Sequence, residues 1–155
     1  MNLFATLQQF VPQQQLSKVA GRLAASRHPY VKRAFIRSFA KAYNVSLDEY
    51  ERQSFNAYES FNDFFTRELK DDARLIDSRA NGIVSPADGV ISQLGQIRDH
   101  KLLQAKGRHY DIGQLLADSE DGSYFADGSF ATVYLAPSNY HRVHMPFAGT
   151  LTKTR

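Results

Sequence analysis

The spacing of hydrophobic residues changes along this chain of 155 residues, and that change constrains the fold more than any other feature. As far as about residue 70, apolar side chains recur every three or four positions, which is the spacing of one helix face. From Ile83 onward, short alternating apolar runs are separated by Gly, Pro, Asp and Asn, as in strands joined by tight turns. The sequence therefore predicts an α+β fold in which N-terminal helices precede a mainly antiparallel β body.

Three N-terminal segments have the spacing of amphipathic helices, and prolines separate them. The first covers residues 3–11 and stops at Pro12, the second covers residues 16–24, and the third covers residues 31–43 after Pro29.

A fourth, shorter helix is expected within residues 61–69, and either Ser60 or Asn62 is suited to cap it. We expect Phe64 and Phe65 to pack in an aromatic core and to anchor the helices to the C-terminal part of the chain. Arg67 fits either the surface or a polar network, and nothing local decides between them.

The N-terminal third is strongly basic. Residues 1–47 carry a formal charge of +7 with no acid before Asp48, whereas the remaining residues carry −4. Basic residues opposite an apolar face are typical of helices in the head-group layer of an anionic membrane. A solvated basic face on a pair of core-packing helices is the alternative, and a nucleic-acid surface ranks last because no binding motif is present. The basic residues are Lys18, Arg22, Arg27, Lys32, Arg33, Arg37 and Lys41.

The C-terminal part has the pattern of short strands and turns. A turn at residues 86–89, in which Gly89 is expected to adopt a positive φ, precedes an alternating strand around Val90 and Leu94. Because the last apolar pattern is still open at Arg155, we expect the chain to be part of a longer polypeptide. The other expected elements are a strand and turn within residues 101–112, a helix over 112–118, a loop over 121–129, a buried strand over 129–137 and a further strand from 148.

Composition excludes some classes of chemistry. The chain has no cysteine, so it has neither disulfides nor thiolate chemistry. No apolar run approaches the roughly 20 residues that a membrane-spanning helix needs.

Three residues stand out as candidates for chemistry: Asp88, His141 and His144. An Asp in a Pro-Ala-Asp-Gly turn often only caps its own backbone. Two histidines three residues apart fit a metal pair if they lie on one turn, although two His and a distant Asp fall short of a zinc signature. A histidine oriented by a carboxylate also fits a general base, but this needs a nucleophile, and Ser123 and Ser129 lie in plain Asp-Gly-Ser turns.

Four stretches resemble phosphatidylserine decarboxylase, a pyruvoyl-dependent enzyme family, in its bacterial proenzyme form. They occur in the family's order and with similar spacing from about residue 55 to the end, and four blocks together are specific where one alone is not. The N-terminal helices match the family only in character. The four stretches are FNDFFTREL (Phe61–Leu69), SPADGVISQLGQI (Ser85–Ile97), LLQAKGRHY (Leu102–Tyr110) and YLAPSNYHRVHMP (Tyr134–Pro146).

The resemblance implies roles for the three candidates. In this family the proenzyme cuts itself at a Gly-Ser bond within a Leu-Gly-Ser-Thr-like motif, and the exposed serine becomes a pyruvoyl group. By resemblance, Asp88 and His144 are the carboxylate and base of the self-cleavage triad, and His141 assists decarboxylation. The pyruvoyl group then withdraws electrons while phosphatidylserine loses carbon dioxide and becomes phosphatidylethanolamine.

The resemblance also implies partners and location. Residues 1–50 are expected to be membrane-associating helices, with residues 1–45 docking on the anionic surface that holds the lipid substrate, and 51–155 the first part of the α+β catalytic domain. The expected partners are a small pyruvoyl-bearing α chain and a second copy, giving a homodimer of processed heterodimers, without nucleic acid. The expected location is peripheral, on the cytoplasmic face of the bacterial inner membrane.

One departure from the family limits what this chain can do. No Leu-Gly-Ser-Thr stands in it, since Leu94-Gly95 is followed by Gln96, so the pyruvoyl-forming serine is absent and we expect the fragment to be inactive alone. A non-catalytic module that binds anionic lipid through a degenerate decarboxylase fold is the alternative. A biotinyl- or lipoyl-type β module and a metal hydrolase rank lower.

Overall fold

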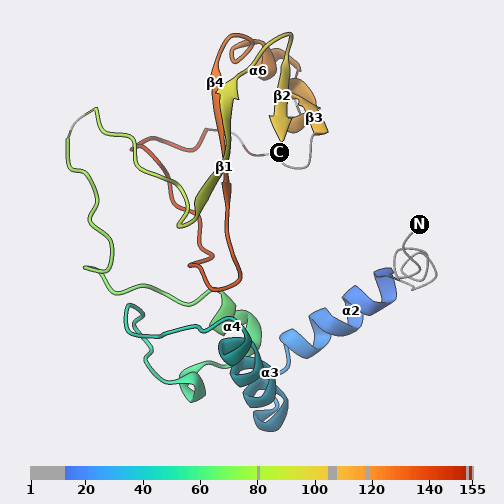
Figure 1. Ribbon diagram of the computed structural model, residues 1–155, viewed down its shortest axis with the longest axis vertical. Coiled ribbons are helices and arrows are strands. Elements are labelled where there is room, and N and C mark those ends of the chain that lie inside the picture. Colours follow the sequence, from blue (N-terminus) through green and yellow to red (C-terminus); the bar gives the residue numbers. More distant parts are fainter. Residues whose placement is uncertain (1–12, 80, 105–107, 118, 153, 155) are drawn as a thin grey trace. The chain divides into compact units, whose positions relative to one another are not determined.

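The computed structural model describes residues 13–79, 81–104, 108–117, 119–152 and 154 (Figure 1). Its contacts divide the chain into two units, Met1–Leu75 and Ile76–Arg155. The described helices of the first unit and the strands of the second confirm the predicted α+β class. The helix predicted over residues 3–11 lies outside the described residues.

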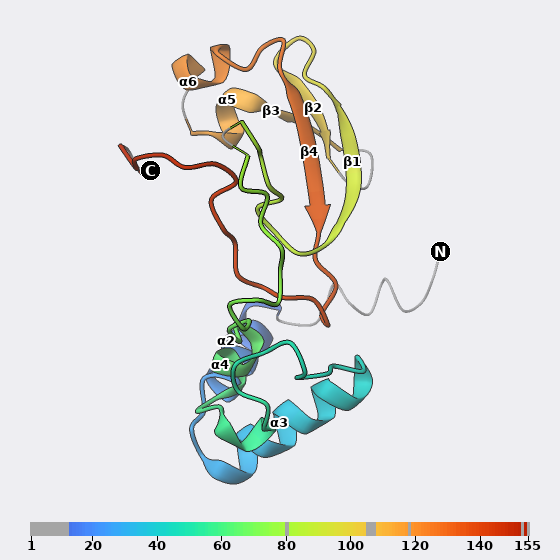
Figure 2. The same ribbon diagram turned by 90° about the vertical axis from the view of Figure 1, so that its left-hand side faces the viewer.

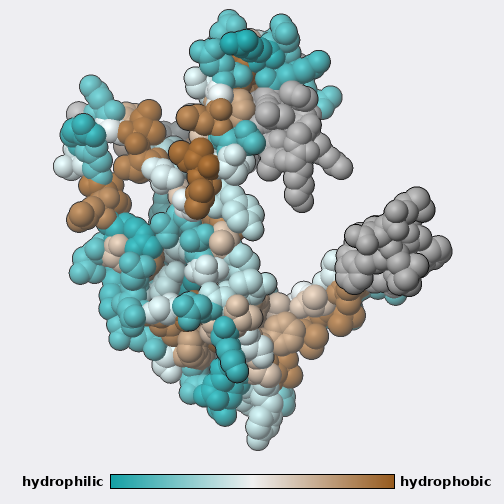
Figure 3. Space-filling view, viewed as in Figure 1, coloured by the Kyte–Doolittle hydropathy of each residue, from teal (hydrophilic) through white to brown (hydrophobic). Residues whose placement is uncertain are grey.

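Two of the three amphipathic helices predicted for the N-terminal segments are present among the described residues. Helix α2 spans Gln13–Ala24, and helix α3 spans Pro29–Ala42 with its proline in the first turn, where the missing N–H costs nothing. On α3, the apolar face buries Ile36 and Ala40. On α2, by contrast, the apolar positions Leu16 and Val19 remain 60% and 51% exposed, and hydrophobic side chains follow this helix in Figure 3.

An aromatic cluster fixes the short helix α4, Phe61–Phe65, against α3. The ring of Phe39 on α3 makes edge contacts with Phe61, Phe64 and Phe65, with ring centroids 5.1 to 6.1 Å apart. Ser60 caps α4 by accepting a hydrogen bond from the Asp63 N–H at 3.1 Å. The predicted cap and the predicted aromatic packing of the two phenylalanines are therefore confirmed.

Arg67 is buried rather than on the surface, and its guanidinium lies over aromatic rings. It lies 4.3 Å from the ring centroid of Tyr50 and 5.2 Å from that of Phe64. An isolated pairing of Tyr50 with Leu69 holds the chain around it, with the Glu51 N–H donating to the carbonyl of Glu68 at 3.0 Å. The single-turn helix η1, Phe55–Ala57, lies in the intervening loop.

Two antiparallel strand pairs form the described sheet structure of the second unit (Figure 2). Strand β1, Val90–Gln96, pairs with β4, Ser129–Tyr134, and the pairing shifts register between Ile91 and Gln93. Strand β2, Lys101–Gln104, pairs with β3, Arg108–Asp111.

Residues 97–128 leave β1 and return to β4 as one excursion, which carries β2, β3 and two short helices. The excursion closes where Gln96 pairs with Ser129 and where the Ile97 N–H donates to the carbonyl of Gly128 at 2.8 Å. Helix α5, Ile112–Leu115, is capped by the carboxylate of Asp111, and a small core forms where Phe130 packs against Ile97 and Ile112. The remaining helix is α6, Ser119–Ser123.

Three local predictions for this unit are wrong. The segment 121–129 begins inside helix α6 and is a loop only afterwards. Strand β4 is half-buried, because Phe130 packs against the small core while other residues, such as Tyr134, are exposed. Residues 148–152 are not in a strand, since no ladder partner is present for them among the described residues.

Candidate active site

Two segments that are far apart in the sequence lie side by side in the second unit. The His144 N–H donates to the carbonyl of Pro86 at 2.8 Å, and the Val84 N–H donates to that of Pro146 at 3.0 Å. At the other end of these two segments, Val90 pairs with Tyr134, and this pair is the last one of the β1–β4 ladder. The segments 84–90 and 134–146 are thus fixed to each other by backbone hydrogen bonds, and each carries predicted site residues.

Gly89 is required by a close approach and not by its backbone angle. Its φ lies outside the left-handed region, so the positive φ predicted for it is wrong. A Cβ atom at this position would lie 2.4 Å from the carbonyl oxygen of Tyr134 and 3.0 Å from its carbonyl carbon. Only a glycine lets β1 begin this close to the end of β4.

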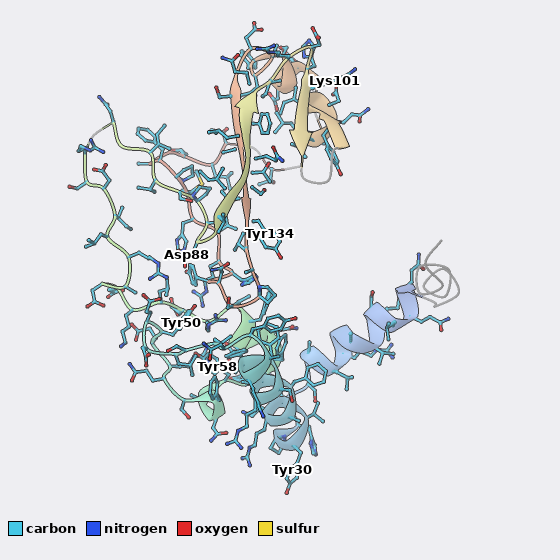
Figure 4. The ribbon with its side chains drawn as sticks, in the orientation of Figure 1. Tyr30, Tyr50, Tyr58, Asp88, Lys101 and Tyr134 are labelled. Carbon is cyan, nitrogen blue, oxygen red and sulfur yellow. The ribbon has the colours of Figure 1, made fainter. Side chains whose placement is uncertain are left out.

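Asp88 lies in the segment that these contacts hold. It is half-buried and follows Pro86, whose carbonyl receives the His144 N–H, by two residues. The turn before it is braced by the Ser85 hydroxyl, which donates to the carbonyl of Ala87 at 2.7 Å. Figure 4 shows Asp88 near the start of β1, while Tyr134 marks the end of β4.

His144 makes a side-chain contact that the sequence pattern did not predict. Its Nε2 lies 2.7 Å from the hydroxyl oxygen of Tyr140, and the two rings stack with centroids 5.5 Å apart and planes at 23°. Tyr140 is buried, at 5% exposure, whereas His144 itself is exposed. No periodicity signals this pair, because residues 140–145 form neither helix nor strand and the chain must bend to join them.

His141 is oriented by its own turn. The Asn139 N–H donates to the carbonyl of Ala136 at 2.9 Å, and the Asn139 side-chain oxygen accepts from the Ala136 N–H at 2.6 Å. The carbonyl oxygen of Asn139 then lies 2.8 Å from Nδ1 of His141. A carbonyl oxygen can only accept, so Nδ1 carries the proton and Nε2 is the basic nitrogen of the neutral ring.

The two histidines therefore have separate partners. His141 bonds to a backbone carbonyl and His144 to a phenol, and residues 140–145, which carry both, form no helix. Within the described ranges, no three His, Asp or Glu side chains form a group suited to a metal ion. The arrangement suits acid–base chemistry, since it presents a carboxylate and two oriented imidazoles on joined segments.

The seven basic residues within residues 13–47 fall into two groups. Lys32 donates to the carbonyl of Tyr58 at 2.5 Å, and Arg27 pairs with Glu59 at 3.1 Å on the surface. The others are exposed and have no ion pair with any residue that the structure describes; they are Lys18, Arg22, Arg33, Arg37 and Lys41. No described helix is both long and apolar enough to cross a membrane.

Comparison with known proteins agrees with these segments. A sequence profile described as phosphatidylserine decarboxylase matches residues 61–155, and a second, described as PSD, matches residues 3–44. Because the first match covers more than half of the chain, the chain belongs to the phosphatidylserine decarboxylase family, as the four sequence blocks predict.

Individual relatives extend this similarity over the whole chain. The chain is 86% identical, over all 155 residues, to the phosphatidylserine decarboxylase proenzymes of Psychrobacter cryohalolentis and Psychrobacter arcticus, and it covers 56% of each. It is 51% identical to the proenzyme of Acinetobacter baumannii over 152 residues, which are 98% of this chain and 54% of that protein. The chain thus spans about half the length of the curated relatives it matches.

Proposed function

We propose that this chain supplies the N-terminal part of an enzyme that converts phosphatidylserine to phosphatidylethanolamine with a self-generated pyruvoyl group. One observation carries the proposal: in a member of this family, backbone bonds join the segment of Asp88 to the segment of His141 and His144. The remaining chemistry must come from a serine that this sequence lacks.

The first step in this proposal is self-cleavage. His144 removes the proton of a serine hydroxyl supplied by the rest of the polypeptide, the serine oxygen attacks the carbonyl carbon before it, and the C–N bond of that peptide breaks to leave an ester while the proton passes from His144 to the freed nitrogen. Loss of the serine Cα proton then expels the carboxylate of the preceding chain, and water replaces the nitrogen as ammonia to leave the pyruvoyl group. Asp88 fixes the imidazole and stabilises the imidazolium that forms, as a carboxylate does in a catalytic triad. The 2.8 Å bond between the His144 N–H and the Pro86 carbonyl supports this assignment, because it ties the base to the segment of the carboxylate.

The His141 side chain also suits a site that holds a pyruvoyl group. When present, such a group draws electrons from the substrate as carbon dioxide leaves. His141 is fitted to act beside it, since the bond from Nδ1 to the Asn139 carbonyl leaves Nε2 as the nitrogen that takes up or returns a proton. In decarboxylation, His141 would bind the head group or move a proton. Both roles depend on this tautomer.

The basic helices are the proposed docking surface for an anionic membrane. Five exposed cations without an ion pair among the described residues, together with the exposed apolar positions of α2, give residues 1–45 the character of an interfacial element. This supports a peripheral location on the cytoplasmic face of the inner membrane. The processed enzyme is proposed to be a homodimer of heterodimers, each with a small pyruvoyl-bearing α chain.

The test joins this chain to the C-terminal part of the Psychrobacter arcticus proenzyme and measures intact mass and conversion of phosphatidylserine. We expect the joined protein to split into two chains and form phosphatidylethanolamine, and the 155-residue chain alone to do neither. Asp88→Asn and His144→Gln should leave the joined protein uncut, whereas His100→Asn, a turn histidine with φ of 59°, should cut normally. Product formation by the chain alone, or normal cutting by His144→Gln, contradicts the proposal.

A non-catalytic module that binds anionic lipid is the second candidate, favoured by the exposed cations of α2 and α3. The similarity to proenzymes along the whole chain favours the enzyme. The joined protein separates the two, because a binding module would bind anionic vesicles without cutting itself or changing the lipid.

A further inference from the structure

The contact between Tyr140 and His144 is unusually specific for two residues four positions apart in an irregular segment. In extended chain they would be separated by roughly 13 Å, since each residue advances about 3.3 Å. Instead, the hydroxyl oxygen and Nε2 are 2.7 Å apart and the rings stack. The segment bends to make this contact, and the tyrosine is buried while the histidine stays exposed.

The chemistry of the pair determines where the protons lie. A phenol is a stronger acid than the N–H of neutral imidazole, and an imidazole nitrogen is a stronger base than a phenol oxygen. The hydroxyl of Tyr140 therefore donates and Nε2 of His144 accepts. A neutral ring has only one N–H, so the ring proton of His144 is then on Nδ1. Free imidazole side chains prefer the opposite tautomer, so the hydrogen bond selects a form that solvent would not.

We propose that Tyr140 is a positioning residue for His144, whose hydroxyl holds Nε2 and thereby keeps the ring proton on Nδ1. This tautomer is the one a base needs, because Nδ1–H can donate to a carboxylate while the lone pair of Nε2, which accepts from the phenol in this chain, can accept from a serine hydroxyl in its place. The buried phenol holds the ring until the serine hydroxyl replaces it at Nε2. The tautomer rests on the 2.7 Å contact together with the relative acidities of phenol and imidazole, whereas its use in self-cleavage rests on the proposed function of His144.

The first test reads the tautomer directly in the 155-residue chain. Nitrogen chemical shifts of ¹⁵N-histidine-labelled protein, above the pH at which the rings protonate, distinguish the two tautomers of each ring. We expect His144 to carry its proton on Nδ1, as His141 does through the Asn139 carbonyl. In Tyr140→Phe, which keeps the stacked ring and removes only the hydroxyl, His144 should shift toward the Nε2–H form. The exposed Tyr124→Phe should leave it unchanged.

The second test measures the consequence in the protein joined to the C-terminal part of a relative. Tyr140→Phe should slow self-cleavage about two- to tenfold, because one hydrogen bond contributes roughly that factor. An Nε2–H tautomer of His144 in the unmodified chain overturns the inference whether or not the variant folds. An unchanged tautomer of His144 in folded Tyr140→Phe overturns it as well. A tautomer shift with unchanged cleavage refutes the positioning role. If the unmodified joined protein does not cut itself, the proposed function fails while the tautomer result stands.

Discussion

Replacing Gly89 by alanine tests the geometry that joins the two site segments. The added Cβ would lie 2.4 Å from the Tyr134 carbonyl oxygen, whereas a carbon–oxygen contact needs about 3.3 Å, so the two backbones must separate by roughly 0.9 Å. Neither partner is a flexible side-chain end that could swing aside, because the contact is with the backbone of β4. Tyr134 pairs with Val90, so the displacement enters the β1–β4 ladder beside Asp88.

The energetic cost follows from this displacement. Overpacking of a well-fitted site costs about 1–3 kcal/mol, and alanine returns about 0.4–1 kcal/mol by restricting the unfolded chain. We expect Gly89→Ala to lower the free energy of unfolding by about 1–2 kcal/mol. In the joined protein, a shift of this size next to the carboxylate should slow self-cleavage by roughly ten- to a hundredfold, since a 1 Å misplacement can cost about a hundredfold.

Urea unfolding of the chain and cleavage rates of the joined protein measure the two effects. Gly21→Ala is the matched control, because nothing lies within 4 Å of its added Cβ and the residue is inside helix α2. That variant should be unchanged or more stable by about 0.5–1 kcal/mol. If Gly89→Ala unfolds and cuts like the unmodified protein, the close approach of the two strands is not what the site depends on.

Three further predictions concern the first unit. Asp63→Asn should lower the free energy of unfolding by about 1–2 kcal/mol in urea titrations, since the carboxylate accepts two 2.6 Å bonds from Arg52; a loss below about 0.3 kcal/mol would mean that solvent screens the pair. Burial raises the pKa of Tyr58 above its usual value of 10.0, so the folded state should lose stability as pH rises past about 10, where the unfolded chain ionises first. Tyr58→Phe should flatten that alkaline loss, and an identical loss in the variant would exclude Tyr58 as its source. Arg37→Glu should weaken co-sedimentation with anionic vesicles by tenfold or more, at about 1 kcal/mol per charge, and should not affect binding to neutral ones. Lys32→Gln should act mainly on stability, because Lys32 already donates to a backbone carbonyl, and equal effects on binding would contradict this division of the cations.

The parts of the fold that were predictable from sequence are those set by local physics. Helices α2 and α3 follow from apolar spacing and from Pro29, and the cap by Ser60 needs only the three residues after it. The buried position of Arg67 was not predictable, because the ring of Tyr50 reaches it only through the pairing of two distant segments.

The candidate site shows the same division. Asp88, His141 and His144 are visible in the sequence, and a backbone bond ties the segments that carry them. The reason for Gly89 was predicted wrongly, since its neighbour Tyr134 is close only after the ladder forms. Tyr140 was missed because its contact depends on a bend that no periodic pattern encodes.

The excursion of residues 97–128 leaves the ladder at the end opposite the site. Gln96 and Ser129 close it, while Val90 and Tyr134 mark the site end, so six residue steps, or roughly 20 Å of strand, separate them. A change within the excursion therefore lies roughly 20 Å of strand away from the segment of Asp88. A fluorescent label attached on its exposed surface, for example at Tyr124, would allow self-cleavage of the joined protein to be followed without entering the chemistry.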